Sequence, residues 1–257
     1  TKIDNTWLAM HEAQKQYREE STFRTTGINL SPPFTKILCL SDIHFPFARM
    51  DFLEQILAQH YDAHGIVLNG DIIDGYALSS FQKDKKVALI DEYITAFDFV
   101  DICRRMFKWV VIISGNHDHR GNKVLQALSK ELTSYYQPDL LRRIANGERL
   151  NREGLLVEQL DFSNVYYSST ESWWAQIGKT LFIHPHTKGS AKPGHTVSQW
   201  TTKFKERLGQ NAFDSVVCGH THATFKAIVN NTLMIEQGCL ADFMSYTWDP
   251  RAFYHNS

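Results

Sequence analysis

The sequence is poor in the features that mark the less common classes of protein. It has only 7 Pro and 14 Gly among 257 residues, which excludes a collagen-like or low-complexity chain. No apolar run approaches the roughly 18–20 residues of a membrane-spanning helix, and the first residues, TKIDNTWLAMHEAQ, lack the basic-then-apolar layout of a secretory signal. We therefore expect a protein without a membrane partner.

An excess of charge of one sign is also absent. Lys and Arg total 27 and Asp and Glu total 28, for a net charge of −1. A protein that binds nucleic acid over its whole surface is usually basic, so any such contact here must be local. With 43% hydrophobic and 21% charged residues, the chain has the balance of a globular domain with a sizeable core.

Cysteine is scarce and carries no metal-binding pattern of its own. The chain has four cysteines, none in a C-x-x-C pair, and three of them lie in the apolar stretches ILCL, VVC and GCL. This usage predicts reduced thiols in a cytoplasmic protein rather than a disulfide framework or a zinc knot.

Hydrophobic periodicity predicts an α/β fold. Residues 4–20 form an amphipathic helical pattern and 21–33 a linker, so we expect a helical extension and linker over 1–30 and a main domain over 31–257. Strands are expected at 35–40, 65–68, 109–113, 165–169, 179–183, 215–218 and 232–236, and helices at 51–65, 87–106, 122–132 and 197–208. Strands that alternate with helices are typical of α/β proteins.

Histidine is abundant, with 12 residues, and seven of them fall in short clusters. Five apolar strands end in polar, ligand-type residues: ILCL-SDIH (Asp42, His44), IVL-NGDIID (Asp71, Asp74), VVII-SGNHD (Asn116, His117, Asp118), LFI-HPH (His184, His186) and VVC-GHTH (His220, His222). Sites in α/β sheets form outside the carboxyl ends of strands, and residues i and i+2 of an extended segment point the same way. We expect the five clusters to converge on one metal site.

The chemistry of this set narrows the metal. Asp, Asn and His supply only oxygen and nitrogen ligands, which suit Mn, Fe, Zn, Co or Ni ions, and the richness in imidazole disfavours Mg²⁺ and Ca²⁺. About seven ligands are too many for one tetrahedral ion and fit two ions that share a bridge. Two divalent transition-metal ions are therefore expected, with Mn²⁺ favoured.

The motifs DxH, GDxxD, GNHD, a strand-end His and GHTH, in this order over roughly residues 35–245, resemble those of the calcineurin-like metallophosphoesterases. The resemblance implies a four-layer α/β/β/α sandwich of two mixed β-sheets flanked by helices. It also implies a metal-dependent phosphoric ester hydrolase in which a metal-bridging hydroxide attacks phosphorus.

Carried over position by position, the resemblance assigns a role to each motif residue. One ion would be held by Asp42, His44, Asp71 and His222, and the other by Asp71, Asn116, His184 and His220, with Asp71 as the bridge. His117 matches the catalytic histidine and Asp74 the carboxylate that orients it. Since the family supplies one strand-end histidine, His184 is favoured over His186, which would contact a ligand or face the substrate.

Charge arithmetic supports an anionic substrate. Two divalent ions bring +4, Asp42 and Asp71 bring −2, and a bridging hydroxide brings −1, which leaves about +1 to attract a phosphate. The ions and Asn116 would hold the phosphoryl oxygens. His117 would stabilise the developing charge or give a proton to the leaving oxygen.

Further candidate substrate contacts lie beside these motifs. They are His119 and Arg120 after GNHD, His186, and Lys188 and Lys192 in the loop TKGSAKPGHT. A helix-entry turn for the first pair, and a plain solvated connection for the loop, explain these residues equally well.

Two departures from the family pattern narrow the substrate. Protein phosphatases of this superfamily carry GDxVDRG and RGNHE, whereas this chain reads GDIIDGY and SGNHD, without either arginine. A phosphodiester or nucleotide-type substrate is therefore favoured over a dianionic monoester. The alternatives are a DNA or RNA nuclease, a phosphomonoesterase, a non-catalytic metal-binding scaffold, and an α/β protein without metal. The sequence does not predict an oligomeric state.

Overall fold

The computed structural model describes residues 9, 10, 12, 36–79, 86–121, 123–124, 139–168, 172–187, 189–190 and 192–242. Nearly all of the extension and linker predicted over 1–30, most of the helix predicted over 122–132, and Lys188 lie outside these residues. The division into an extension and a main domain therefore stays a prediction. Within the described part of the chain, no helix is long and apolar enough to cross a bilayer.

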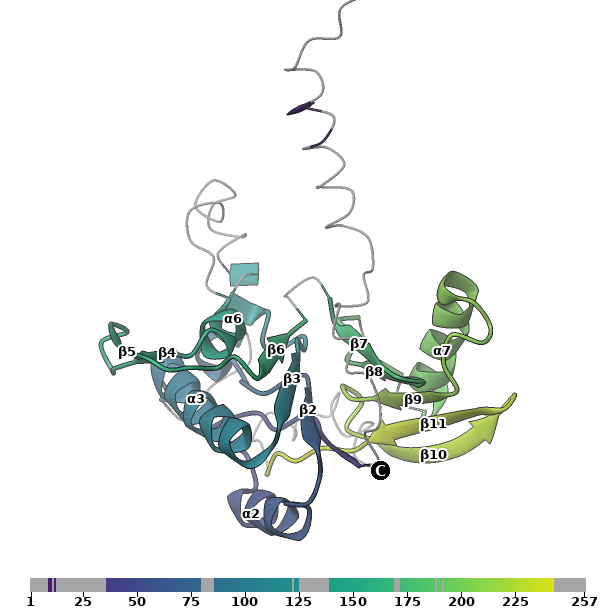
Figure 1. Ribbon diagram of the computed structural model, residues 1–257, viewed down its shortest axis with the longest axis horizontal. Helices are drawn as coiled ribbons and strands as arrows, with labels where there is room; N and C mark the ends of the chain where they lie inside the picture. The colour runs from purple at the N-terminus through teal and green to yellow at the C-terminus, as the bar shows by residue number, and fades with distance from the viewer. Residues whose placement is uncertain are drawn as a thin grey trace, which may run out of the picture.

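The first sheet is built from apolar strands that all run in parallel. It contains β1 (Ile37–Leu40), β2 (Gly65–Asn69), β3 (Trp109–Ile113) and β6 (Val165–Tyr167), in the order β1-β2-β3-β6 (Figure 1). Every residue of β2 and β3 is buried. A strand covered on both faces loses the apolar–polar alternation, which explains the continuous runs GIVL and WVVII.

Helices cover one face of this sheet. They are α2 (Met50–Gln59), α3 (Leu89–Met106) and α6 (Leu140–Ala145), with a 3₁₀ turn, η1 (Tyr76–Leu78), at the start of the segment that leads to α3. Leu53 of α2, Phe97 of α3 and Ile144 of α6 join one buried apolar cluster with β-strand residues such as Leu68 and Ile112. Burial of these stripes holds the three helices against the sheet.

The second sheet is mixed and carries one helix. It contains β7 (Trp174–Ile177), β8 (Thr180–Ile183), β9 (Ser215–Cys218), β10 (Thr224–Val229) and β11 (Thr232–Gln237), in the order β10-β11-β9-β8-β7. The pairs of β9 with β8 and with β11 are parallel, and the outer pairs are antiparallel. Helix α7 (His195–Leu208) packs on the outer face through Val197 and Phe204. A small hairpin of β4 (Glu148–Leu150) and β5 (Leu156–Gln159) forms a separate two-stranded sheet.

The two sheets pack face to face and complete four layers. Val67, Trp109 and Val111 of the first sheet share a buried cluster with Ala175 and Phe182 of the second. Within the first sheet, Trp109 lies over Gly65 of the neighbouring strand, where a Cβ would lie 2.2 Å from its ring. The predicted α/β/β/α sandwich is confirmed, with a first sheet whose described strands are all parallel.

Some elements differ from the sequence prediction. The helix expected within 51–65 ends at Gln59, whereas Gly65, predicted to follow that helix and begin a strand, opens β2. Helix α6 and strands β4, β5, β7 and β10 were not predicted. The four residues of β5 are all exposed and α6 has only six residues, so neither shows the period of a buried face.

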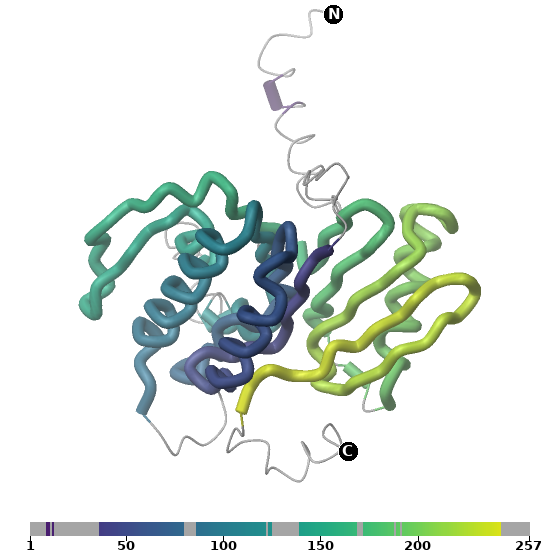
Figure 2. The backbone as a smooth tube through the Cα atoms, turned by 60° about the horizontal axis from the view of Figure 1, so that its bottom comes forward, coloured from purple at the N-terminus to yellow at the C-terminus, as the bar shows by residue number. Residues whose placement is uncertain are grey.

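The carboxyl ends of five strands meet at one edge, where the polar clusters follow. A return segment after β11 joins the two halves there: Leu240 N donates to Asp42 O at 3.0 Å, and Asp242 N donates to Phe47 O at 2.6 Å. Figure 2 shows this segment, at the end of the yellow strand, running back to the loops of the first sheet. The second sheet thereby closes on the loop that carries Asp42.

Candidate metal centre

Five of the predicted ligands have an unusual backbone conformation. Their φ angles lie in the left-handed region, at 53° for Asp42, 54° for His44, 50° for Asp71, 79° for His220 and 56° for His222. This region is uncommon for residues other than glycine and costs about 1–3 kcal/mol when it is strained. The surrounding hydrogen bonds hold the loops in place, as in the bond from His44 N to Asp71 O at 2.9 Å. Such concentrated strain is typical of a functional site.

Four donor atoms surround one point beside β1 and β2. His222 Nε2 lies 3.2 Å from both His44 Nε2 and Asp42 Oδ1. His44 Nε2 lies 3.9 Å from Asp42 Oδ1 and 3.8 Å from Asp71 Oδ2. Atoms that bind one ion at about 2.0–2.2 Å are separated from one another by about 3–4 Å. The arrangement fits a metal ion with these four ligands.

A second donor group shares Asp71. Asp71 Oδ2 lies 3.2 Å from His184 Nε2, and the donor atoms of Asp71, His184 and His220 all lie within 4.8 Å of one another. Asn116 Oδ1 is 2.5 Å from His220 Nδ1 and completes the group. Because Asp71 belongs to both groups, its carboxylate has the position of a bridge between two ions.

The hydrogen bonds of two histidines leave one nitrogen of each for a cation. His184 Nδ1 donates to Asn69 O at 2.7 Å, and its buried Nε2 lies 3.2 Å from Asp71 Oδ2, where it offers a lone pair to a metal ion when it is not protonated. His44 Nδ1 lies 3.0 Å from Asp74 Oδ1 and its Nε2 faces His222. A buried imidazole lone pair that faces carboxylates is the arrangement expected of a metal-ligating histidine fixed by its other nitrogen.

The charges of the site suit a metal cation. Burial lowers the pKa of His184, but attraction to Asp71 and Asp42 outweighs this effect and raises the value to about 9. Burial raises the pKa of Asp71, but His184 and His117 outweigh it and hold the value well below its ordinary range. The carboxylates are thus ionised and hold protons on neighbouring imidazoles, for which a metal cation would compete.

His117 and Asp74 are brought together as predicted. His117 Nδ1 lies 3.0 Å from Asp74 Oδ1 and 3.0 Å from Asp74 O, and its Nε2 lies 4.0 Å from Asp71 Oδ2. The same Asp74 Oδ1 also contacts His44 Nδ1, a second contact that the sequence did not predict. Asp74 therefore orients both a predicted ligand and the predicted catalytic histidine.

Arg120 lies against this pair. Its Nη1 donates to Asp74 O at 2.8 Å, and its Nη2 is 3.1 Å from His117 Nε2. Because a guanidinium nitrogen only donates, His117 Nε2 accepts in this arrangement. Of the predicted substrate contacts, Arg120 is thus the one placed directly at His117.

The other predicted substrate contacts are more dispersed. The rings of His119 and His186 form an edge-on pair with centroids 4.4 Å apart, and His186 Nε2 contacts Ser114 O at 2.9 Å, at the end of β3. Burial lowers the pKa of His186 to about 4. Lys192 is exposed. The start of its loop passes over His220, since a Cβ on Gly189 would lie 3.2 Å from His220 Cδ2.

Two carboxylates that the sequence analysis left without a role hold the loops in shape. Asp118 accepts from Asp71 N at 3.0 Å, Ile73 N at 3.0 Å and Gly115 N at 2.8 Å, and so fixes the turn that carries Asp71. Glu92, buried on α3, accepts from Gly75 N at 2.6 Å and from Ala77 N at 3.3 Å. The GNHD motif contains Asp118, whereas no local pattern marks Glu92.

Glu92 should make stability depend on pH. Burial and the charge of Asp74 raise the pKa of Glu92 from 4.5 to about 7. The folded state therefore holds the proton more tightly than the unfolded state, and this contribution to stability is full below pH 4.5 and is lost as pH rises through about 7. Glu92→Gln mimics the protonated form. We therefore expect the free energy of unfolding of this variant to fall by about 2–3 kcal/mol less than that of wild type as the pH rises.

The measurement is the free energy of unfolding in denaturant at about pH 5 and about pH 8, for wild type and Glu92→Gln. The matched control is Asp91→Asn, which changes the adjacent and more exposed carboxylate. Parallel pH dependences in wild type and Glu92→Gln would show that Glu92 is ionised throughout.

Solved structures of low sequence identity resemble this chain. Vacuolar protein sorting 29 from Cryptosporidium parvum is 17% identical, with a TM-score of 0.42, over 83% of this chain and 79% of that one. A novel archaeal phosphodiesterase is 14% identical, with a TM-score of 0.43, over 82% and 88%. YfcE, a phosphoesterase from E. coli, is 14% identical, with a TM-score of 0.38, over 82% and 83%. No curated protein sequence matches.

The similarity to these solved structures is too weak to assign a family, but the comparison with family models does assign one. The model of the calcineurin-like phosphoesterase family matches residues 35–224, well over half of the chain. The matched range contains the loops that bring Asp42, Asp71, Asn116, His184 and His220 together. The chain therefore belongs to the calcineurin-like phosphoesterases, metal-dependent hydrolases that act on phosphate esters.

Proposed function

We propose that this protein is a phosphodiesterase with a binuclear metal centre. Asp42, His44 and His222 would hold one ion, and Asn116, His184 and His220 the other, with Asp71 shared between them. The observation that carries this proposal is that Asp71 Oδ2 lies 3.2 Å from His184 Nε2 and 3.8 Å from His44 Nε2, so one carboxylate serves two donor groups.

When bound, the two ions would activate water as a nucleophile and neutralise charge on the phosphoryl oxygens. The residues of the chain position and complete this chemistry. Asp74 holds His117 through Nδ1, and Nε2, which accepts from Arg120 in this structure, would donate a proton to the leaving oxygen once substrate has displaced Arg120 and Nε2 is protonated. Arg120, at 3.1 Å from His117 Nε2, adds a fixed positive charge where the phosphate would lie.

A diester fits the charge near the ions better than a dianionic monoester. The position after Asp74 is Gly75 and the one before Gly115 is Ser114, so neither offers a cation. Of the predicted substrate contacts, Arg120 is the positive side chain placed at His117, and it also contacts Asp74. One guanidinium suits the single negative charge of a diester or a nucleotide-type substrate.

The ligand types indicate which metal ion to supply, and the cysteines indicate the cellular compartment. Oxygen and nitrogen ligands in both donor groups favour Mn²⁺ as the first ion to supply, with Fe, Zn, Co and Ni as alternatives. All four cysteines are free thiols, as expected for a cytoplasmic enzyme.

The proposal is tested by comparing two model substrates with Mn²⁺ supplied. We expect a higher kcat/KM for bis(p-nitrophenyl) phosphate than for p-nitrophenyl phosphate, because the site offers few cations to a dianion. A panel of nucleotides, cyclic nucleotides and dinucleoside polyphosphates then narrows the substrate. The opposite ratio would favour a phosphomonoesterase.

Two other functions have specific discriminators. Cleavage of single- or double-stranded DNA or RNA with Mn²⁺, followed on gels, would indicate a nuclease, against which the net charge of −1 argues. Metal binding without hydrolysis of any ester in the panel would indicate a scaffold. The presence of every motif residue, including His117, favours the enzyme.

A further inference from the structure

Cys239 lies beside the metal centre but belongs to none of the motifs. It follows β11, in the return segment that joins the second sheet to the first. The backbone on both sides is fixed, because Leu240 N donates to Asp42 O at 3.0 Å and Arg49 N donates to Leu240 O at 3.0 Å. The sulfur contacts Asp42 O at 3.4 Å and lies 3.4 Å from Ala241 N. The thiol is thus held next to the first predicted ligand.

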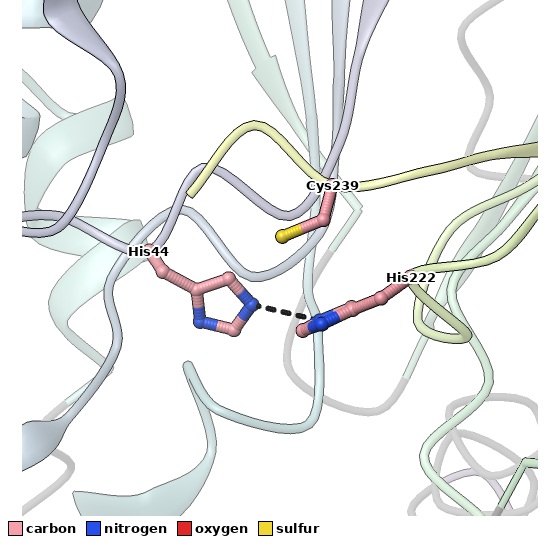
Figure 3. Close-up of side chains that lie close together, drawn as sticks. All are labelled: His44, His222 and Cys239. Atoms are coloured by element: carbon pink, nitrogen blue, oxygen red, sulfur yellow. Dashed lines mark hydrogen bonds between the residues drawn. The ribbon is translucent and has the colours of Figure 1, made fainter. Parts of the chain in front are cut away.

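The side chain is directed at two predicted ligands. Figure 3 shows the sulfur of Cys239 facing the gap between His44 and His222, whose Nε2 atoms lie 3.2 Å apart. The donor atoms of these three residues all lie within 4.8 Å of one another. Two imidazole nitrogens and a sulfur that converge in this way form a typical set of transition-metal ligands.

The orientation of His44 is a second observation that points to this gap. His44 is fully buried and its Nδ1 is engaged by Asp74 Oδ1 at 3.0 Å, so Nε2 directs its lone pair to the same gap. His222 Nε2 also lies 3.2 Å from Asp42 Oδ1. Asp42, His44, His222 and Cys239 therefore surround one place.

The other three thiols do not share this position. Burial raises the pKa of Cys103 and of Cys218 well above the ordinary value. Burial raises the pKa of Cys39 to about 12, against the opposing effect of its hydrogen bond with Gln237. Among the four cysteines, Cys239 is the one whose sulfur groups with metal-ligating side chains.

We propose that Cys239 coordinates, as a thiolate, the ion held by Asp42, His44 and His222. The sulfur–metal bond forms as the thiol proton leaves to solvent. This inference rests on the proposed binuclear centre. It gives the two metal positions different ligand types, with sulfur at only one of them. A thiolate favours Zn, Co or Fe over Mn at the first position, whereas Asn116, His184 and His220 offer only oxygen and nitrogen at the second.

The test uses the absorption of Co²⁺, whose bond to a thiolate gives a near-ultraviolet charge-transfer band. Metal-free wild-type protein is titrated with Co²⁺, alongside Cys239→Ser, Cys239→Ala and the control Cys103→Ala, whose thiol lies in the core under α3. We expect wild type and Cys103→Ala to develop the band with one of two bound Co²⁺ ions. Both Cys239 variants should bind Co²⁺ without it, and hold Zn²⁺ at least about tenfold more weakly in one site.

A second measurement needs no substitution. X-ray absorption of the wild-type protein with two Zn²⁺ ions should show one sulfur neighbour at about 2.3 Å. Two bound ions without this sulfur, or an unchanged Co²⁺ band in Cys239→Ser, would overturn the inference. If such protein still hydrolyses bis(p-nitrophenyl) phosphate, the proposed function stands. Failure to bind Co²⁺ at all would overturn both.

Discussion

Replacing Asp71 by Asn is expected to reduce kcat/KM by about a thousandfold or more and to remove metal from both positions. Asp71 Oδ2 lies 3.2 Å from His184 Nε2 and 3.8 Å from His44 Nε2, so one substitution removes a negative charge from two donor groups. Metal ions stabilise the transition state by several kcal/mol, and each 1.36 kcal/mol is a factor of ten in rate.

The substitution should leave the fold intact. Asp71 Oδ1 accepts from His117 N at 2.8 Å, and the carbonyl oxygen of Asn can keep that bond. Metal content by elemental analysis and kcat/KM on the diester are measured together, with Asp62→Asn, an exposed partner of Lys36, as the control. An Asp71→Asn protein that binds two ions and turns over normally would contradict the bridging position.

Replacing His117 by Ala is expected to lower kcat by about 10²–10⁴-fold while both metals are retained. This range is typical of a lost general acid or base. His117 lies near His44 and Asp71, but we expect it not to hold an ion, because its Nδ1 is engaged by Asp74 and its Nε2 lies 3.1 Å from Arg120 Nη2. His117→Ala should therefore lose activity but retain its metal, whereas Asp71→Asn should lose both.

Kinetics and metal analysis on the same preparation distinguish the two roles. The matched control is His60→Ala, which removes a histidine at the end of α2, away from the proposed ligands. Normal turnover by His117→Ala would remove this residue from the chemistry. Loss of one metal equivalent would instead make it a ligand.

The convergence of the motif residues could be predicted from the sequence because each motif follows an apolar strand. Asp42, Asp71 and Asn116 follow the apolar runs of β1, β2 and β3, and the parallel pairing of these strands brings their carboxyl ends to one edge. The four-layer sandwich came from the family resemblance that these motifs carry, and the packing of Trp109 against the second sheet confirms it.

Other contacts could not be predicted, because nothing local encodes them. Glu92 is 17 residues from Gly75 and sits in a helix whose pattern reports only its apolar face, so its bond to Gly75 N has no sequence signal. Cys239 follows an apolar strand like many buried thiols, and its place beside His44 depends on the path of the return segment. The left-handed backbone of Asp71 likewise follows from tertiary hydrogen bonds rather than from propensity.

The second sheet includes strands that lie after the last signature motif in the sequence. The motifs alone are therefore not enough to build the metal centre. The family match stops at residue 224, after every motif has been read, yet β11 sits between β10 and β9. A polypeptide cut at that boundary would contain each signature motif but lack β10 and β11, which form one side of the second sheet, and the hydrogen bond from Leu240 N to Asp42 O. We therefore expect a working centre to require residues 225–242 as well as the motifs that precede them.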